Sequence, residues 1–294
     1  MKLNNVLIII FFLILNPSFN QTHPALPVAL LHGFMQICSH EDMKNMVNFM
    51  SHKTGKYARC IESGGGIVDL TRSFEDQAKE ACKIISSDPE FQSDFALVSI
   101  SQGGILARYI IEKCQMNGVV KRFISIGGPL AGTHQLPHCL RGVVCHILNS
   151  FADWFCYKGY VQKTFGPSGY FRVSNHLDRY KKSKSLLLKV NNMEKNYDPN
   201  AKSRFENLEK LVLVQFKRDT MITPRESAHF QELDDKHKLI DMKDTEIYKN
   251  NLFGLKTLDE ANKIVKFLVD EKHCYYSWED LNEYVIPYIK GDYE

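Results

Sequence analysis

The chain has 294 residues, of which 44% are hydrophobic and 24% are charged, the composition of an ordinary globular protein with a sizeable core. Its formal net charge is +3, which is too close to neutral to indicate nucleic acid as a partner. No basic run is interleaved with aromatic residues, so we expect no nucleic-acid-binding function.

Residues 1–20 have the pattern of a secretory signal peptide. A positive n-region with Lys2 precedes an unbroken apolar run from Val6 to Leu15, about as long as an h-region and too short to span a bilayer. The cleavage region would lie at Asn16–Asn20, and an uncleaved anchor is the alternative. No later segment has the ~18 uninterrupted apolar residues of a membrane span. We therefore expect the mature chain, residues 21–294, to enter the secretory pathway without a transmembrane span.

Short apolar runs and helically periodic segments alternate along the first half of the mature chain. The predicted strands are Pro27–Leu31, Tyr57–Ile61, Phe95–Val98 and Phe123–Ile126. The predicted helices, from apolar side chains at helical spacing, are 42–53, 73–85 and 105–113. This alternation implies one α/β domain with a mostly parallel sheet. The glycine run 64–66 lacks the spacing of a phosphate-binding loop, so we expect a plain loop there.

His32-Gly33 follows the first predicted strand directly. In an α/β hydrolase, a His-Gly at this place puts a backbone N–H, here that of Phe34, opposite the nucleophile as an oxyanion donor. The alternative is a polar residue followed by a turn glycine, because the dipeptide alone is a weak signal.

The hexapeptide Ser99–Gly104 lies between a predicted strand and a predicted helix. That context is typical of a nucleophile elbow, in which a sharp turn holds Ser101 Oγ over the end of the sheet. The backbone N–H of Gln102 would then lie at the helix N-terminus, where an oxyanion can be bound. Ser99 occupies the first glycine position of the usual G-x-S-x-G pattern, which weakens the motif. A plain strand-to-helix turn with an incidental serine is the alternative.

The alternation of strands and helices stops between about Leu130 and Arg204. This stretch has a turn-rich segment at 166–170 and helical runs such as Gly142–Phe155, but no strong strand pattern. We expect an inserted cap above the carboxyl ends of the strands, where ligand crevices form. Its large apolar residues would line a groove that leads to Ser101, or would form only the core of a structural cap. They are Leu136, Leu140, Val143, Val144, Ile147, Leu148, Phe151, Trp154, Phe155, Tyr170 and Phe171.

The sheet pattern returns at Leu211–Phe216, and a last apolar run, Val265–Val269, is predicted to be a helix or a strand. Asp219 follows the first of these runs, and His273 follows the second. The order Ser101, Asp219, His273 is the order of nucleophile, acid and base in α/β hydrolases. The imidazole would take the serine proton, and the carboxylate would fix the tautomer of the ring.

Other acids and histidines compete for these roles. Asp241 and Asp244 are rivals for the acid, but neither follows a strand as directly as Asp219. His229 and His237 lie in a polar stretch and are expected to be solvated.

The chain has eight cysteines and no C-x-x-C pair, so their spacing does not indicate zinc. In an oxidising compartment, disulfides are the better interpretation. The number of cysteines alone does not assign the pairs. We expect no metal and no cofactor.

Blocks along the mature chain resemble the palmitoyl-protein thioesterase family of α/β hydrolases. The resemblance runs from about Pro27 to Ile289, and the blocks around Gly127 and Gly254 are far more specific than the elbow. The matching blocks are His32-Gly33, Ser101–Gly104, Ile124–Pro129 with Ala131–Thr133, Pro167–Tyr170, Val214–Thr220, Gly254–Asp259 and Ile286–Tyr288.

The resemblance implies an α/β hydrolase with a mostly parallel central sheet and an inserted helical cap. The family's catalytic serine, acid and base fall on Ser101, Asp219 and His273. Its oxyanion donors fall on the backbone N–H groups of Phe34 and Gln102. The implied activity is hydrolysis, through an acyl-enzyme, of the thioester between a long fatty acyl chain and a protein cysteine. The implied partners are S-palmitoylated proteins or peptides and long-chain acyl thioesters, typically in lysosomes.

The resemblance also implies disulfides. The pairs are Cys82–Cys114 and Cys139–Cys145, with Cys38–Cys60 as a third pair that follows the pattern of some relatives, while Cys156 and Cys274 have no assigned partner. The family often has a glycosylation sequon at the catalytic acid, and here Arg218 replaces its asparagine. The chain's one Asn-x-Ser/Thr site, at Asn20, lies in the cleavage region. The choice between lysosomal sorting and secretion therefore stays open.

Two further interpretations stay open at this point. An acyl-CoA thioesterase, lipase or esterase of the same fold would use the same triad, and the shape of the cap pocket would separate them. An inactive lipid-binding relative would keep the fold and lack a triad member, whereas this sequence lacks none.

Overall fold

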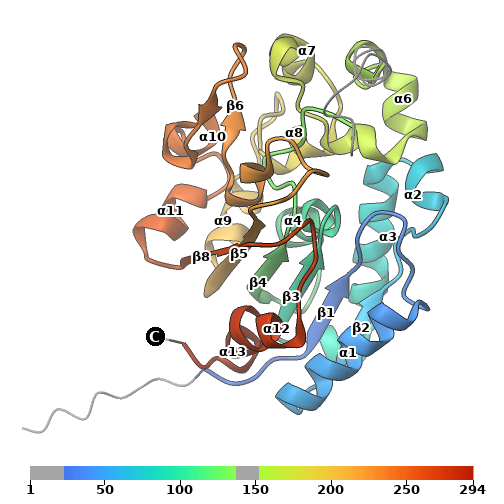
Figure 1. Cartoon of the computed structure of the whole chain (residues 1–294), viewed down its shortest axis with the longest axis vertical. Helices are drawn as coiled ribbons and strands as arrows, with labels where there is room; N and C mark the ends of the chain where they lie inside the picture. The colour runs from blue at the N-terminus through green and yellow to red at the C-terminus, as the bar shows by residue number, and fades with distance from the viewer. Residues whose placement is uncertain (1–22, 137–151, 294) are drawn as a thin grey trace, which may run out of the picture.

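The structure, a computed structural model, describes residues 23–136 and 152–293 (Figure 1). Its centre is a six-stranded sheet in the order β2-β1-β3-β4-β5-β8, and every neighbouring pair is parallel. The strands are β1 (Val28–Leu31), β2 (Ala58–Ile61), β3 (Phe95–Ile100), β4 (Val120–Ile126), β5 (Lys210–Phe216) and β8 (Ile264–Val269). The run 265–269, which the sequence left between helix and strand, is therefore the edge strand beside β5.

Helices cover both faces of the sheet (Figure 1). One face packs against α1 (Glu41–Thr54), α12 (Trp278–Tyr284) and α13 (Ile286–Lys290), and the other against α3 (Phe74–Ser87), α4 (Gly103–Lys113) and α9 (Pro199–Glu206). Successive side chains of a strand point to opposite faces. In β1, accordingly, Val28 and Leu30 belong to the first core, and Ala29 and Leu31 belong to the second.

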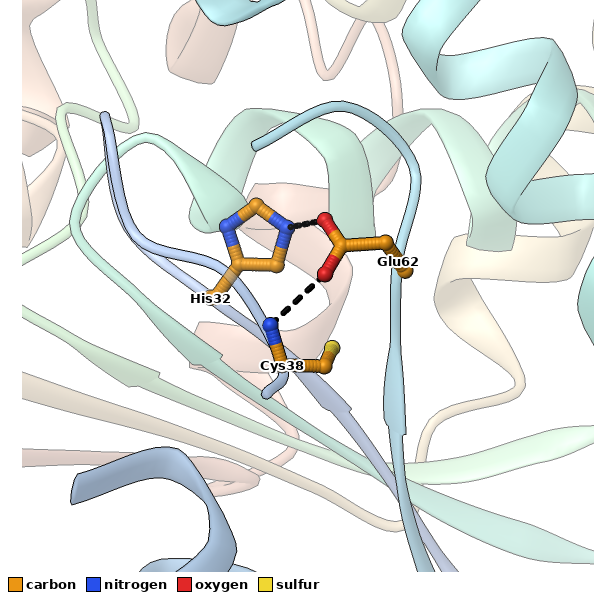
Figure 2. A group of neighbouring side chains, drawn as sticks. All are labelled: His32, Cys38 and Glu62. Atoms are coloured by element: carbon orange, nitrogen blue, oxygen red, sulfur yellow. Dashed lines mark hydrogen bonds and ion pairs between the residues drawn. The ribbon is translucent and has the colours of Figure 1, made fainter. Parts of the chain in front are cut away.

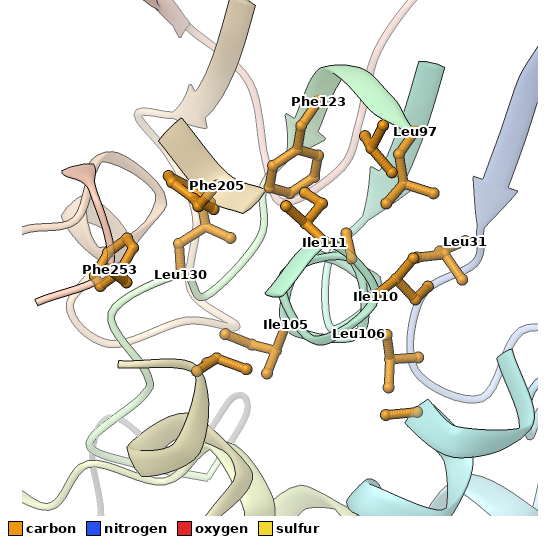
Figure 3. Packing of buried hydrophobic residues seen from close by; sticks show 14 of the residues in the cluster. Leu31, Leu97, Ile105, Leu106, Ile110, Ile111, Phe123, Leu130, Phe205 and Phe253 are labelled. Atoms are coloured by element: carbon orange, nitrogen blue, oxygen red, sulfur yellow. The ribbon is translucent and has the colours of Figure 1, made fainter. Parts of the chain in front are cut away.

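Helix α4 is the centre of the larger core. An apolar helix surrounded by protein has no need of a polar face, and Ile105, Leu106, Ile110 and Ile111 are all almost fully buried. Figure 3 shows these side chains packed among Leu31 of β1, Leu97 of β3, Phe123 of β4, and Leu130, Phe205 and Phe253. The helix that follows Ser101 is thus held from several sides.

The described residues between β4 and β5 form the expected helical cap. It contains α6 (Gly159–Thr164), the 3₁₀ turns Gly166–Tyr170 and Ser174–His176, α7 (Leu177–Lys181) and α8 (Leu186–Val190), and it leads into α9. Its described residues add no strand to the sheet, although Thr133 and Phe171 form an isolated bridge. With the parallel sheet, this cap confirms the predicted α/β hydrolase architecture.

The remaining elements are short. They are α2 (Val68–Thr71), α10 (Glu246–Lys249), α11 (Leu255–Glu260), the hairpin of β6 (Glu232–Leu233) and β7 (Leu239–Ile240), and the 3₁₀ turns Pro89–Phe91, Arg225–His229 and Met242–Asp244. No described helix is both long enough and apolar enough to cross a membrane. The expected signal peptide lies outside the described residues.

Two disulfides are present in the described part of the chain. Cys38 is bonded to Cys60, and Cys82 is bonded to Cys114, with Cα atoms 5.6 and 5.8 Å apart. The second bond joins α3 to the residue after α4, and the two helices cover the same face of the sheet. Cys156 and Cys274 are free thiols, and the expected pair Cys139–Cys145 lies outside the described residues.

A buried arginine fastens the cap to α4. The Arg108 side chain is fully buried and donates to Glu112 at 3.0 Å, to Asn191 Oδ1 at 2.7 Å and to the Leu130 carbonyl at 3.2 Å. It also donates to the Val190 carbonyl. The pKa of the Glu112 carboxyl is raised to about 8, because the effect of burial exceeds the opposing effect of the Arg108 charge.

We predict that Arg108→Leu lowers the free energy of unfolding by about 3–5 kcal/mol, because it leaves a buried carboxyl and several acceptors without their donor. Urea denaturation of the two proteins measures the difference. Lys181→Leu is the matched control, since Lys181 pairs with Glu246 at the half-exposed surface and such pairs contribute about 0–1 kcal/mol. Equal losses in the two variants would contradict the proposed anchoring role.

Candidate active site

Ser101 occupies a strained turn between β3 and α4. Its φ is +49°, in the left-handed region that residues other than glycine seldom adopt. Its N–H donates to the Ile126 carbonyl of β4 at 2.9 Å. The turn requires α4 to pass close to β1, because a Cβ on Gly103 would lie 2.8 Å from the His32 carbonyl oxygen. This is the geometry of a nucleophile elbow.

Ser99, the unusual first residue of the elbow, fits this packing. Its side chain is fully buried on β3, and its hydroxyl donates to the Ile124 carbonyl at 3.5 Å. A small hydroxyl side chain therefore replaces the usual glycine without leaving its polar atom unpaired.

Three of the predicted residues meet at the carboxyl end of the sheet. Ser101 Oγ lies 2.8 Å from His273 Nε2, and His273 Nδ1 lies 2.6 Å from Asp219 Oδ2. A carboxylate only accepts, so Nδ1 carries the hydrogen and Nε2 is free to accept the serine proton. The side chains of His273 and Asp219 are 12% and 3% exposed, so little water competes for these bonds.

The turn after β5 orients the Asp219 carboxylate. Its Oδ1 accepts the backbone N–H groups of Met221 at 2.7 Å and Ile222 at 3.1 Å. The other oxygen is thereby directed at His273, which follows the neighbouring strand β8. Because β5 and β8 are adjacent and parallel, their carboxyl ends deliver the acid and the base side by side.

The rival residues lie elsewhere. Asp241 accepts the Lys243 N–H at the start of a 3₁₀ turn, and Asp244 pairs with Lys249. The expectation that His229 is solvated was wrong, because its Nε2 lies 3.3 and 3.2 Å from backbone carbonyls of β5 and β8. Burial and nearby Lys266 lower its pKa to about 4. A turn packed against these strands leaves it only partly exposed, which the polar sequence around it does not reveal.

Cys274 adds a thiol to this site that sequence reasoning left without a role. Its Sγ lies 3.5 Å from His273 Nε2 and 3.6 Å from the Ile126 carbonyl oxygen. Burial lowers the pKa of His273, but the Cys274 sulfur and the Asp219 carboxylate outweigh it and raise the pKa to about 10. The signal in the sequence was the adjacency of a free cysteine to the candidate base.

The two expected oxyanion donors border the serine. Gln102 immediately precedes α4, and Phe34 lines the same pocket as Ser101. The peptide before Phe34 is close to the nucleophile, because a Cβ on Gly33 would lie 3.3 Å from Ser101 Cβ.

An apolar pocket of about 300 Å³ opens at Ser101. Apart from Ser101, its lining is mostly apolar and comes from five parts of the chain: Phe34, Leu70, Thr133, Leu136, Phe165, Pro167, Tyr170, Phe171, Met221 and Ile222. Two larger hollows, of about 700 and 640 Å³, are lined mostly by polar and charged side chains and include no triad member. Of these three hollows, the small apolar pocket is the one that opens at Ser101.

The lining differs from the one expected. Of the apolar cap residues named from the sequence, Leu136, Tyr170 and Phe171 line the pocket. Trp154 and Phe155 are 58% and 41% exposed instead, and those between 140 and 151 lie outside the described residues. Sequence reasoning missed Leu70, Phe165, Pro167, Met221 and Ile222 as lining residues, which short turns around the cap bring in.

One group in the described part of the chain has metal-ligand atoms close together. The donor atoms of His32, Cys38 and Glu62 lie within 4.8 Å of one another. The Cys38 sulfur is bonded to Cys60 and cannot serve as a thiolate ligand. The imidazole and the carboxylate that remain are only two ligands, so this group does not fit a metal site.

Comparisons with known proteins find similar sequences along most of this chain. The sequence profile of the palmitoyl protein thioesterase family matches residues 27–273. Palmitoyl-protein thioesterase 1 of Caenorhabditis elegans is 28% identical over 277 residues, covering 91% of this chain and 92% of its own. Palmitoyl-protein thioesterase 3 of Dictyostelium discoideum is 24% identical, covering 90% and 92%. Lysosomal thioesterase PPT2-B of Xenopus laevis is 29% identical, covering 59% and 60%.

Solved structures of similar shape include a monoacylglycerol lipase from Paleococcus ferrophilus. It is 15% identical, with a TM-score of 0.46, and the match covers 92% of this chain and 97% of the lipase. A ferulic acid esterase matches with a TM-score of 0.47 at 11% identity, covering 94% of this chain and 88% of the esterase.

We predict that kcat/KM rises with pH along a limb whose midpoint lies above 6.5, the ordinary His value, and that Cys274→Ser moves this midpoint to lower pH. Only the neutral imidazole can accept the Ser101 proton. A partner that raises the pKa of His273 keeps the ring protonated to higher pH, and removing the sulfur reverses that effect. Rates of thioester hydrolysis across pH measure both midpoints.

The control for this comparison is Cys156→Ala, which removes the second free thiol of the described residues, one that does not line the pocket at Ser101. Its pH profile should match that of the unmodified protein. Coincident profiles for Cys274→Ser and the unmodified protein would rule out an influence of the sulfur on His273.

Proposed function

The chain belongs to the palmitoyl protein thioesterase family, and on that premise we propose that it removes long fatty acyl groups from protein cysteines. It is an enzyme, a serine hydrolase with the α/β hydrolase fold. The observation that supports this proposed depalmitoylation is the hydrogen-bonded chain from Asp219 through His273 to Ser101, which lies at an apolar pocket.

Acylation is the first half of the proposed reaction. Ser101 Oγ attacks the thioester carbonyl carbon as His273 Nε2 takes the hydroxyl proton, and the carbonyl oxygen becomes an oxyanion between the N–H groups of Phe34 and Gln102. The tetrahedral intermediate then breaks its carbon–sulfur bond, and the leaving sulfur takes the proton from Nε2. The cysteine of the substrate is released as a thiol, and the acyl group stays on Ser101 as an ester.

Deacylation repeats these steps with water. His273 Nε2 removes a proton from a water molecule that attacks the ester carbon, and the same backbone donors stabilise the second oxyanion. Return of the proton to Ser101 Oγ releases the fatty acid. Asp219 stays ionised throughout and stabilises the imidazolium that forms twice in each cycle.

The apolar pocket supports a fatty acyl substrate over a polar one. Burial of each CH₂ group contributes up to about 0.8 kcal/mol, and the pocket offers mainly aliphatic and aromatic side chains to such a chain. We infer that S-palmitoylated proteins or peptides and long-chain acyl thioesters are its substrates. Acyl-CoA or an oxygen ester is the second candidate, because the same triad would cleave both.

The names of the relatives support a place in the secretory pathway. One group is named palmitoyl-protein thioesterase and another lysosomal thioesterase. We propose residues 1–20 as a signal peptide, residues 21–294 as the hydrolase domain and residues 130–204 as its cap, with the mature enzyme in lysosomes or secreted.

We predict that Ser101→Ala lowers kcat for a palmitoyl thioester by about 10⁴-fold or more, because loss of the nucleophile disables the whole triad. Activity and thermal unfolding should be measured together, with Ser87→Ala as a control at the exposed end of α3. Retention of a tenth of the original activity with the fold intact would refute Ser101 as the nucleophile.

We predict that kcat/KM climbs with acyl length and then levels off where the pocket ends, because each added CH₂ is buried in the transition state. A series of thioesters from C4 to C18 on one peptide, assayed below micelle-forming concentrations, measures the profile. Leu70→Trp should move the plateau to shorter chains, and Leu239→Trp, at an exposed position of β7, should leave it in place. A maximum at C4 to C6 would favour a short-chain esterase.

A further inference from the structure

The loop that carries Phe34 begins with a buried histidine. His32 is 2% exposed at the end of β1, and its Nδ1 lies 2.9 Å from the carbonyl oxygen of Gly33. A carbonyl oxygen only accepts, so Nδ1 donates this bond. The same oxygen also accepts the Gln36 N–H at 3.2 Å.

These two bonds determine which way the Phe34 N–H points. The Gly33 carbonyl and the Phe34 N–H belong to one peptide group, which is planar and trans, so the two bonds point in opposite directions. Fixing the carbonyl oxygen against His32 therefore turns the Phe34 N–H to the other side of the peptide. Unlike an arginine or lysine aimed at an oxyanion, a backbone donor can be oriented only through its own peptide.

Glu62 attracts the histidine ring at Nε2 when the ring is protonated, through a charge contact and not a hydrogen bond. The Glu62 Oε1 lies 3.1 Å from His32 Nε2, and its Oε2 accepts the Cys38 N–H at 2.6 Å (Figure 2). One carboxylate thus contacts both the beginning and the end of the loop. The disulfide from Cys38 to Cys60 ties the same loop end to β2.

The middle of the loop is restrained independently. The buried carboxylate of Asp69 accepts the Met35 N–H at 2.7 Å and the Gly65 N–H at 2.9 Å. The Gln36 side chain accepts the Gly33 N–H at 2.8 Å. Since Met35 and the loop end are already held by other groups, the bond from His32 acts mainly on the Gly33–Phe34 peptide.

We propose that His32 and Glu62 are positioning residues for the oxyanion hole: Glu62 orients the His32 ring, and the ring orients the peptide that presents the Phe34 N–H. This inference rests on the proposed function, because it takes Phe34 as an oxyanion donor. Neither side chain touches the substrate in this arrangement. Their effect falls on stabilisation of the transition state and not on binding of the acyl chain.

The test compares four variants. His32→Ala removes the donor, and His32→Asn keeps a side-chain N–H close to the position of Nδ1. Glu62→Ala removes the carboxylate from a position that is 41% exposed, so it is expected to fold. Glu246→Ala is the matched control, because it removes the carboxylate of a half-exposed ion pair with Lys181.

Two readouts are needed. One is kcat and KM for a palmitoyl thioester. The other is the rate at which a long-chain fluorophosphonate labels Ser101, a reaction that also places a negative oxygen near the oxyanion donors but needs no knowledge of the natural substrate. Loss of a whole oxyanion donor costs about 10²–10³-fold in kcat, so a misdirected one should cost about 10–100-fold.

We expect His32→Ala to lower kcat and the labelling rate by that factor with KM unchanged. His32→Asn should recover most of the loss, Glu62→Ala should lie between, and Glu246→Ala should match the unmodified protein. Equal losses in His32→Ala and His32→Asn would overturn the proposal. If His32→Ala does not fold, the other two variants decide: rates within about twofold of the original in both His32→Asn and Glu62→Ala would overturn it.

The same data separate this inference from the proposed function. If the unmodified protein is labelled at Ser101 but hydrolyses no thioester, the thioesterase assignment fails, and the labelling rates of the variants still decide the role of His32. If the unmodified protein is neither labelled nor active, both proposals are wrong.

Discussion

The parallel alignment of the central strands is the constraint on which the site depends. Parallel strands end at the same edge of a sheet, so the residues that follow β1, β3, β5 and β8 are brought to one place although they are far apart in the sequence. Ser101, Asp219 and His273 are separated by up to 172 positions and join through bonds of 2.8 and 2.6 Å. If the strands paired in another order, the same residues would be present in the chain but would not meet at one site.

Close packing beneath this edge turns the alignment into a defined geometry. Helix α4 passes β1 so closely that only glycine fits at position 103, and this contact holds Ser101 at its positive φ. A strained backbone conformation of this kind persists only where the surrounding structure holds it in place. Here the surroundings are the apolar side chains around α4 and the fully buried Arg108, which ties the same helix to the cap. The pocket is thus built from the scaffold that positions the nucleophile.

The site also contains opposing electrostatic demands. Catalysis by the proposed mechanism needs a neutral imidazole, whereas the carboxylate and the sulfur beside His273 favour its charged form. The carboxylate is required to stabilise the imidazolium during the reaction, whereas the mechanism needs no sulfur beside the ring. Below this raised pKa the free enzyme holds the ring protonated, so we expect the contact between Cys274 and His273 to lower the reaction rate in acid.

The sequence by itself determined the local parts of this protein. Apolar runs and helical spacing predicted the strands and helices, because burial on a sheet or against it imposes a period on the side chains. The spacing of Ser101, Asp219 and His273 after predicted strands nominated a triad, and the resemblance to a family gave the hydrolase architecture. The apolar run 265–269 stayed ambiguous, since a short buried segment has no distinguishing period.

Tertiary structure alone decided what depends on contacts between distant segments. It placed His229 against two strands, partly buried, although its neighbours in sequence are polar. It brought Leu70 and Met221 into the pocket and left Trp154 on the surface. No local pattern encodes these outcomes, because each side chain's environment is made by residues tens to hundreds of positions away.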